Sequence, residues 1–391
     1  MPRPRASWRN TACALPFWKR AKRRKAAAAT AKGCSTPKSR RTTPSRPNCC
    51  WQATATPAAC CKTYCPIPTH GAATACCILI LTKGLQQHHA HLYRSVSADE
   101  AAQIAGIDVF SDGLYWPQGV WLNPPAVVRA LLNHPLIALH EDTPLSATEY
   151  DGANWTAHTP RGSFSATHII YCMGAHSPNA ADANVSALPF RQIRGQTGVA
   201  AASSFSTRLR CALSGESYIS PSWQGQHCYG ATFVLNSNDD AWHPHEEAAN
   251  RAALQQLNPP LAQSLFEQNS LYSFSDDPFA KPQGHAALRC DSPDHLPVVG
   301  ALGDIAAMQT AYAKLALDKN YRLDNVPCPY LPNAYINTAH GTRGLATAPV
   351  CAAAIAADIL GLPQPLSQRL RTALHPNRAV IRAIVRQQPL L

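Results

Sequence analysis

Acidic residues are absent from the first quarter of this chain. The sequence has 391 residues and 23 Asp and Glu, but none of these precedes Asp99. The same stretch holds 17 of the 35 Lys and Arg, which leaves 18 basic against 23 acidic residues in the remainder. The formal charge of +12 therefore belongs to the N-terminal segment alone, and it does not indicate that the folded part binds nucleic acid.

Long apolar runs and metal-binding cysteine pairs are missing from the same segment. Its longest apolar run, Cys76–Leu81, is far shorter than the ~20 residues that span a bilayer. Nine of the 15 cysteines lie at or before Cys77 without a C-x-x-C pair, so we expect no metal site. The six later ones, including Cys172, which we place in the core, are scattered singly, as in a reducing compartment. We expect a cytoplasmic protein that does not enter a membrane.

Residues 1–82 lack the periodicity, caps and strand patterns of a folded domain. We interpret them as a basic, cysteine-rich segment that is unstructured, or that is translated out of frame. Two alternatives stay open: a basic nucleic-acid-binding arm around Lys19–Lys25, and a targeting peptide. His88, His89 and His91 fall just after this segment, and we interpret them as solvated residues, not as metal ligands.

From Tyr93 onward the chain carries clear helix signals. Ser97 and Glu100 form a capping box for a helix that Gly106 ends. Asn123 before Pro124 predicts a second helix start. Further helices are expected at residues 245–257, stopped by two prolines, and at 349–360, where the residues are apolar on almost every face and so should be buried.

The predicted strands alternate with these helices. An apolar run at 168–173 ends in Gly174, as a buried parallel strand does beside a ligand. Residues 218–221 and 228–233 predict a hairpin around Gly225, and residues 335–339 predict another strand. The order indicates an α/β (α+β) chain, in which a nucleotide-binding domain is interrupted by an antiparallel-β domain.

Five sequence segments together carry a specific resemblance. They are residues 171–177 after the apolar strand, Arg194–Gln196 (R-G-Q), the run from Arg289 to Gly300, the stretch from Asn337 to Pro349, and Pro376–Arg378. In combination they resemble the FAD-dependent oxidoreductases of the D-amino-acid/glycine oxidase superfamily. Within that superfamily the likeness is greatest to the oxidoreductase half of the bifunctional tRNA 5-methylaminomethyl-2-thiouridine biosynthesis proteins, of MnmC type, and it covers residues 93–386.

The resemblance implies FAD as cofactor and a Rossmann-like domain made of residues 83–190 and 286–391, with a substrate domain at 191–285. Backbone amides at the start of a helix would face the flavin edge that becomes negative on reduction. The residues expected at the cofactor are Gly174, His340, Gly341, Thr342, Arg343, Gly344 and Leu345.

The resemblance also implies the substrate residues. Arg289 is expected to bind the substrate carboxylate, although it could instead form a surface ion pair. Tyr218 is expected to line the pocket, although it could instead be a core residue. The substrate would be carboxymethylaminomethyl-(2-thio)uridine at the tRNA wobble position, whose carboxymethyl group leaves after hydride transfer to the flavin and hydrolysis of the imine. No catalytic side chain is expected, because the cofactor performs the difficult step.

The tRNA partner would normally be shared with a methyltransferase domain that is fused to this half or cooperates with it, and no DNA is expected. Arg378, Arg382 and Arg386 recur at helical spacing in a region without acids, and we interpret them as a tRNA contact or, alternatively, as a solvated face. Asp239-Asp240 and Asp276-Asp277 are expected in loops.

Two departures from the family bear on cofactor binding. Before residue 98 the chain has only Gly33, Gly71 and Gly84, so the G-x-G-x-x-G fingerprint and its ribose-binding acid are absent there. Ala339 also stands where the family usually has glycine. The chain could thus be a truncated or inactive version of the enzyme. The alternatives are a glycine- or sarcosine-like oxidase that does not act on tRNA, and a non-catalytic remnant that cannot bind FAD.

Overall fold

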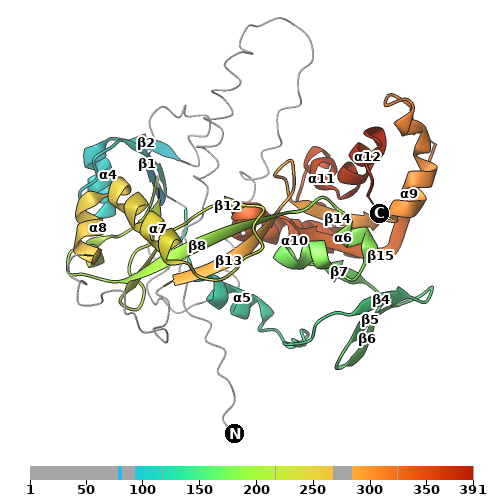
Figure 1. The fold of residues 1–391 in the computed structure, drawn as a ribbon, viewed down its shortest axis with the longest axis horizontal. Helices are drawn as coiled ribbons and strands as arrows, with labels where there is room; N and C mark the ends of the chain where they lie inside the picture. Colours follow the sequence, from blue (N-terminus) through green and yellow to red (C-terminus); the bar gives the residue numbers. More distant parts are fainter. Residues whose placement is uncertain are drawn as a thin grey trace, which may run out of the picture.

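The computed structural model describes residues 78–81, 93–117, 119–215, 217–266, 284–323 and 325–390. The described helices and strands form a mixed α/β structure (Figure 1), which confirms the predicted fold class. The predicted histidine tract at 88–91 and the pair Asp276-Asp277 lie outside these residues.

A nine-stranded sheet dominates the structure. Its strand order is β12-β8-β11-β10-β9-β1-β3-β2. The ninth strand, β13, also pairs with β8 and lies outside this linear order. The strands are β1 (Ile78–Leu81), β2 (Arg94–Val96), β3 (Gly113–Trp116), β8 (Arg191–Ala201), β9 (Ala212–Ser214), β10 (Tyr218–Ile219), β11 (Gln226–Gly230), β12 (Val234–Leu235) and β13 (Gly284–Asp291).

Two strands of this sheet lie at or across the boundaries that the sequence predicts. The strand β1 falls inside the segment 1–82 that we expected to be unstructured, and it pairs parallel with β9 and antiparallel with β3. Its Ile-Leu-Ile-Leu sequence suits a strand. The strand β13 also runs across the predicted boundary at 285/286, and the division of the chain into domains stays a prediction.

Helices cover the two faces of the nine-stranded sheet. One face packs on α4 (Ala98–Ala105), α7 (Pro244–Leu257) and α8 (Pro259–Phe266). The other face packs on α10 (Gly344–Leu360) and α11 (Gln368–Leu374). We call the latter the α10 face. In Figure 1 the long strands β8 and β13 run between the two groups of helices.

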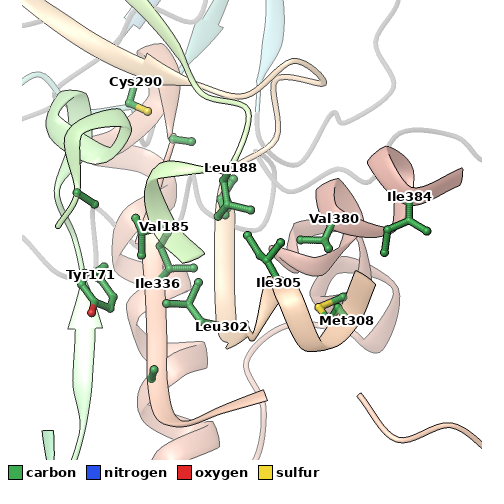
Figure 2. Close-up of a cluster of buried hydrophobic side chains, with 14 of the residues drawn as sticks. Tyr171, Val185, Leu188, Cys290, Leu302, Ile305, Met308, Ile336, Val380 and Ile384 are labelled. Carbon is green, nitrogen blue, oxygen red and sulfur yellow. The ribbon is translucent and has the colours of Figure 1, made fainter. Parts of the chain in front are cut away.

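The second sheet has the order β14-β15-β7, formed by Val298–Gly303, Tyr330–Thr338 and Ile169–Tyr171. The strand β15 is antiparallel to β14 and parallel to β7, as predicted for the apolar strand before Gly174. Around this sheet pack α6 (Ala183–Ser186), α9 (Ile305–Ala311) and α12 (Asn377–Val385), and Figure 2 shows their shared core. A separate meander contains β4 (Ala147–Tyr150), β5 (Trp155–Thr159) and β6 (Gly162–Ala166). The helix α5 (Pro124–Leu132) packs through Val127 in a small cluster with Leu122 and Leu345.

The helix caps follow the local sequence. The Ser97 hydroxyl accepts from the Glu100 amide, Gly106 ends α4 with φ +77°, and Asn123 caps α5. The second half of the predicted capping box is wrong, because the Glu100 carboxylate binds Arg94. The prolines after α7 do not merely stop that helix, since they form the first turn of α8.

Two burial predictions are also wrong. Cys172 is exposed, although we expected it in the core. The helix α10 starts five residues earlier than predicted, and Ala352, Ala353 and Ala356 on one side of it are exposed. By length and composition alone, Gly341–Leu360 could span a membrane. The opposite side of α10 is buried in the core under the α10 face, so its apolar character is explained by packing.

Candidate functional site

The residues predicted to meet the flavin edge lie together in one turn. The strand β15 ends at Thr338, a 3-10 turn occupies Gly341–Arg343, and α10 begins at Gly344. Gly341 has φ +58°, a left-handed conformation that glycine adopts at little cost. His340, Gly341, Thr342, Arg343, Gly344 and Leu345 therefore form a continuous loop at the N-terminus of a long helix, where free amides and the helix dipole favour a negative ligand atom. We call residues 340–345 the flavin-edge loop.

Ala339, just before this loop, has a left-handed backbone conformation, which glycine adopts at little cost. Its φ is +59° and only 1% of its surface is exposed. A β-branched side chain is a genuine outlier at positive φ. We expect Ala339→Val to destabilise the chain by about 2–3 kcal/mol, since overpacking adds to the strain. Ala339→Gly should stay within about 1 kcal/mol of the parent, because relief of strain offsets the lost methyl packing and the greater entropy of the unfolded chain.

Urea unfolding of both variants checks this prediction. In an ordinary extended backbone the order would be reversed, with valine tolerated and glycine costly. Finding that reversed order would mean that residue 339 is not left-handed.

The His340 side chain is engaged within the chain. Its Nδ1 lies 2.8 Å from Thr347 Oγ1 on α10, and its Nε2 lies 2.9 Å from Asn337 Oδ1 on β15. Burial lowers the pKa of His340 to about 4, so the ring is neutral near pH 7. The ring thus ties the strand to the helix, and only the backbone of His340 is placed to meet a cofactor.

A carboxylate that the sequence analysis missed lies against the flavin-edge loop. Asp291, at the end of β13, is 6% exposed, and its Oδ1 would be 3.2 Å from a Cβ placed on Gly341. The other oxygen binds His295 Nδ1, and the Ser292 amide donates to Oδ1. The spacing of Asp291 and His295, four residues apart in a turn, was the available sequence signal. Gly341 is therefore needed both for its φ and for the space that Asp291 takes.

The two predicted substrate residues lie on the same face of the large sheet. Residues that pair directly across neighbouring strands have their side chains on the same face of the sheet. Tyr218 pairs with Gly230, and Gly230 pairs with Thr197. Thr197 in turn pairs with His285, so all four residues share one face. Arg289 is four residues beyond His285 on β13, so it points to this face too. This is the α10 face, which packs on the helix that follows the flavin-edge loop. The structure thus brings Arg289, Tyr218 and the loop to one side of one sheet.

Arg289 and Tyr218 differ in their surroundings. Arg289 is half-buried, and no carboxylate within the described part of the chain pairs with it. The alternative explanation of this arginine, a surface ion pair, therefore finds no support among these residues. Tyr218 is 5% exposed and belongs to the core between the sheet and α10. Its burial favours the core alternative, and its role at a substrate stays a prediction.

Gly174 opens onto free space. It has φ +54°, and a Cβ placed on it would meet nothing within 4 Å. The turn after it is fixed from behind, where Ser177 Oγ lies 2.7 Å from Thr338 Oγ1 at the end of β15. A cofactor could therefore lie across the ends of β7 and β15 without displacing a side chain at Gly174.

The strand β7 beside Gly174 has an open edge. Within the described residues it pairs only with β15, and Ile170 is 45% exposed. In Figure 2, Tyr171 of β7 packs beside Ile336 of β15, so only one side of β7 is covered by the sheet. Ile170 therefore adds an exposed apolar side chain to this edge of the described sheet.

These residues fit one end of FAD only. The flavin-edge loop and Gly174 offer amides and space for the isoalloxazine ring. The adenosine diphosphate end needs a glycine-rich turn between a strand and a helix, and an acid for the ribose. The described residues show no such turn beside β7, and the sequence before Asp99 has no acid.

Arg378, a predicted tRNA contact, is used inside the chain. All five of its N–H donors have acceptors: Asp294 Oδ1 and Oδ2 at 3.1 Å, and the backbone carbonyls of Leu374, His375 and Leu296. No N–H donor of Arg378 remains for a phosphate, so the structure gives no support to the predicted tRNA contact of this residue. The pair instead fastens the start of α12 to the loop that follows β13.

Removing one partner of this pair should be costly. The Arg378 and Asp294 side chains are only 13% and 23% exposed. Asp294→Asn would leave a buried guanidinium charge unbalanced, and we expect it to lower the free energy of unfolding by about 2–4 kcal/mol at pH 7. Asp318→Asn, which changes an exposed acid, should cost less than about 0.5 kcal/mol.

The effect should also depend on pH. Burial alone would raise the pKa of Asp294, but the hydrogen bonds and charge of Arg378 outweigh it and hold this pKa well below its ordinary value. The stabilisation is thus complete above the unfolded-state pKa of about 4 and is lost as the pH falls through the folded-state pKa. Urea unfolding at pH 7 and pH 3 should show the difference between parent and Asp294→Asn shrinking in acid. A constant difference would contradict this role.

Comparison with known proteins connects this geometry to a family. Residues 5–358 match the family described as FAD dependent oxidoreductase (DAO). The chain is 38% identical over 297 residues to the tRNA 5-methylaminomethyl-2-thiouridine biosynthesis bifunctional protein MnmC of Chromobacterium violaceum, covering 75% of this chain and 43% of that protein. It is 35% identical over 297 residues to the MnmC protein of Pseudomonas putida, covering 75% and 44%. The chain thus spans less than half the length of these relatives.

Solved structures share the fold. Glycine oxidase from Geobacillus kaustophilus superposes with a TM-score of 0.61 at 14% identity, over 84% of this chain and 82% of that one. L-proline dehydrogenase from P. horikoshii gives 0.60 at 12% identity, over 84% and 82%. At these identities the likeness supports the fold alone. The DAO match begins at residue 5, whereas the pairwise matches to MnmC proteins leave about a quarter of the chain outside.

Proposed function

Because the chain belongs to the DAO family of FAD-dependent oxidoreductases, we propose that it is the oxidoreductase half of an MnmC-type tRNA-modifying enzyme. Its substrate would be a carboxymethylaminomethyl-(2-thio)uridine at the wobble position of tRNA, in the cytoplasm. A methyltransferase domain, fused in the relatives or supplied as a separate protein, would act on the product.

The observation that carries the proposal is the placement of Arg289. An N-substituted glycine offers a carboxylate, and a half-buried guanidinium without a described carboxylate partner is suited to bind it bidentately. Arg289 lies on the same strand and face as Asp291, which touches the flavin-edge loop. The substrate's methylene carbon would thus be held near the isoalloxazine ring.

FAD, when bound, supplies the oxidation by accepting a hydride from the carbon beside the substrate nitrogen. The residues of the chain would orient that carbon: Arg289 would hold the carboxylate, and the backbone amides of the flavin-edge loop would meet the ring edge. Water then adds to the resulting substrate imine and releases the free aminomethyl group and glyoxylate. No side chain needs to form a covalent bond.

The test compares substrates at saturating FAD. Undermodified tRNA that carries the carboxymethylaminomethyl group should release glyoxylate, while free glycine and sarcosine should react far more slowly. Oxidation of glycine or sarcosine without reaction on tRNA would favour the amino-acid oxidase alternative. A chain that binds no flavin and oxidises neither substrate would be the non-catalytic remnant.

The remaining tRNA contact would involve Arg382 and Arg386 at the end of α12. Both are exposed, although Arg382 shares Asp294 with Arg378. Changing both to alanine should weaken tRNA binding and reduce the slope of log K against log salt by about 1–2, since each phosphate contact contributes ~0.7–0.9. The control variant, Arg129→Ala with Arg208→Ala, removes the same charge elsewhere and should leave the slope nearly unchanged. Equal slopes for the two double variants would exclude α12 as the contact.

A further inference from the structure

The glycine of the R-G-Q segment lies directly beneath the Arg289 guanidinium. In the ladder between β8 and β13, Gly195 pairs with Ala287 and Ile193 pairs with Arg289, so Gly195 and Arg289 are diagonal neighbours on the α10 face. A Cβ placed on Gly195 would be 2.0 Å from Arg289 Nη1 and 2.7 Å from its Cζ and Nη2. The guanidinium therefore occupies the volume that any other side chain would need.

The backbone itself does not require glycine at this position. Gly195 is in the middle of an 11-residue strand and is not among the residues with positive φ. A strand-interior glycine has an entropic cost and usually marks a close approach of another group. Here the approaching group is the guanidinium of Arg289.

The residues on either side of Gly195 prevent the strand from moving away. Arg194 is 2% exposed, and its Nε donates to Glu246 Oε1 at 2.8 Å on the opposite face. The Gln196 side chain bonds the backbone of His243 twice, with Nε2 donating to the carbonyl and Oε1 accepting from the amide, both at 2.7 Å. An added methyl at Gly195 would thus displace the flexible end of Arg289 and leave β8 in place.

We propose that Gly195 is a positioning residue for substrate binding, which sets the guanidinium of Arg289 in the place where it receives the substrate carboxylate. This inference rests on the proposed function, in which Arg289 is that carboxylate's partner. Arg194 and Gln196 fix the strand, and Gly195 leaves the space, so the three residues of the segment act together.

The test measures carboxylate affinity in the full chain at saturating FAD. The probe is methoxyacetate, which has an ether oxygen in place of the reacting nitrogen, and its Kd is measured by titration calorimetry or by NMR. Gly195→Ala should weaken binding by about 10- to 100-fold, because the loss of one hydrogen bond to a charged group reduces affinity by about this factor. Its urea midpoint should stay close to that of the parent.

Two further variants separate positioning from a structural effect. Gly198→Ala alters the same strand on the opposite face, where a Cβ would be 2.4 Å from Tyr229 Cζ, so it should lower stability and leave the Kd unchanged. Arg289→Lys should weaken binding in the parent but change it less than about threefold in the Gly195→Ala background, because the two sites are coupled.

The outcomes distinguish failure of the proposed function from failure of the role given to Gly195. If the parent chain does not bind methoxyacetate, or if Arg289→Lys leaves the Kd unchanged in the parent, the proposed function fails and the inference with it. If the parent binds through Arg289 and Gly195→Ala binds equally well, or if Gly198→Ala weakens binding as much, only the role of Gly195 is overturned.

Discussion

Arg289→Ala is expected to reduce kcat/KM for a carboxymethylamino substrate by about 30- to 4000-fold, when the rates are normalised to the amount of bound flavin. Loss of one member of a desolvated charge pair typically costs about 2–5 kcal/mol, and each ~1.4 kcal/mol is a factor of ten. Arg289 lies on the face that packs on α10, on the strand that touches the flavin-edge loop, and no described carboxylate competes for it. The flavin content should be unchanged, because the arginine is not placed to hold the cofactor.

The measurement is steady-state kinetics together with the absorbance of bound flavin. Arg191→Ala is the matched control, since this exposed arginine belongs to the neighbouring strand and has no assigned role. It should change kcat/KM by less than about threefold. Unchanged kinetics in Arg289→Ala would exclude the arginine as the carboxylate partner, and loss of flavin would indicate a role in cofactor binding instead.

Local features of the fold could be predicted because they depend on neighbours in the sequence. Three such features are confirmed by the structure: the helix cap by Ser97, the left-handed helix end at Gly106, and the helix cap by Asn123. Each of them is determined by residues within three or four positions. The hairpin around Gly225 was also predicted, although its strands are shorter than expected. The flavin-edge loop belongs to the same class, since its position between a strand and a helix could be read locally.

The errors arise where a distant residue decides the outcome. The spacing of Arg378 in the sequence was that of arginines along an exposed helix face. In the structure its side chain is instead bound by Asp294, which lies 84 residues earlier. The Glu100 carboxylate was expected to accept a hydrogen bond at the start of its own helix, but it binds Arg94 instead. Gly195 had no sequence signal for its role, because the Arg289 guanidinium that covers it belongs to another strand. Charge and periodicity patterns do not show which tertiary partner a side chain will find.

The strand β1 was missed for a different reason. Its surroundings in the sequence are basic, rich in cysteine and without acids, so the composition of the whole segment argued against folding. The four residues Ile78–Leu81 nevertheless fit between β3 and β9. The strand propensity of a short run can therefore indicate its structure correctly even when the composition of the surrounding segment argues against folding.

We expect this chain to bind FAD far more weakly than a complete member of the family. An anion at a glycine-rich helix start and a carboxylate on the ribose together contribute about 3–5 kcal/mol, which corresponds to two to four orders of magnitude in Kd. The residues before Asp99 provide neither feature. We also expect poor solubility, because Ile170 on β7 and Leu136 and Leu139 after α5 are exposed by 45%, 90% and 59%.

The most direct test is the amount of flavin bound per chain, measured by absorbance after purification at a fixed FAD concentration. The comparison is with a version whose codons before Tyr93 are read in the alternative frame. If the described residues form only the flavin-edge and substrate half of the site, the present chain should hold well under one FAD, and the reframed version should approach one. Stoichiometric FAD in the present chain would contradict this account and would show that residues 1–82 belong to the cofactor site.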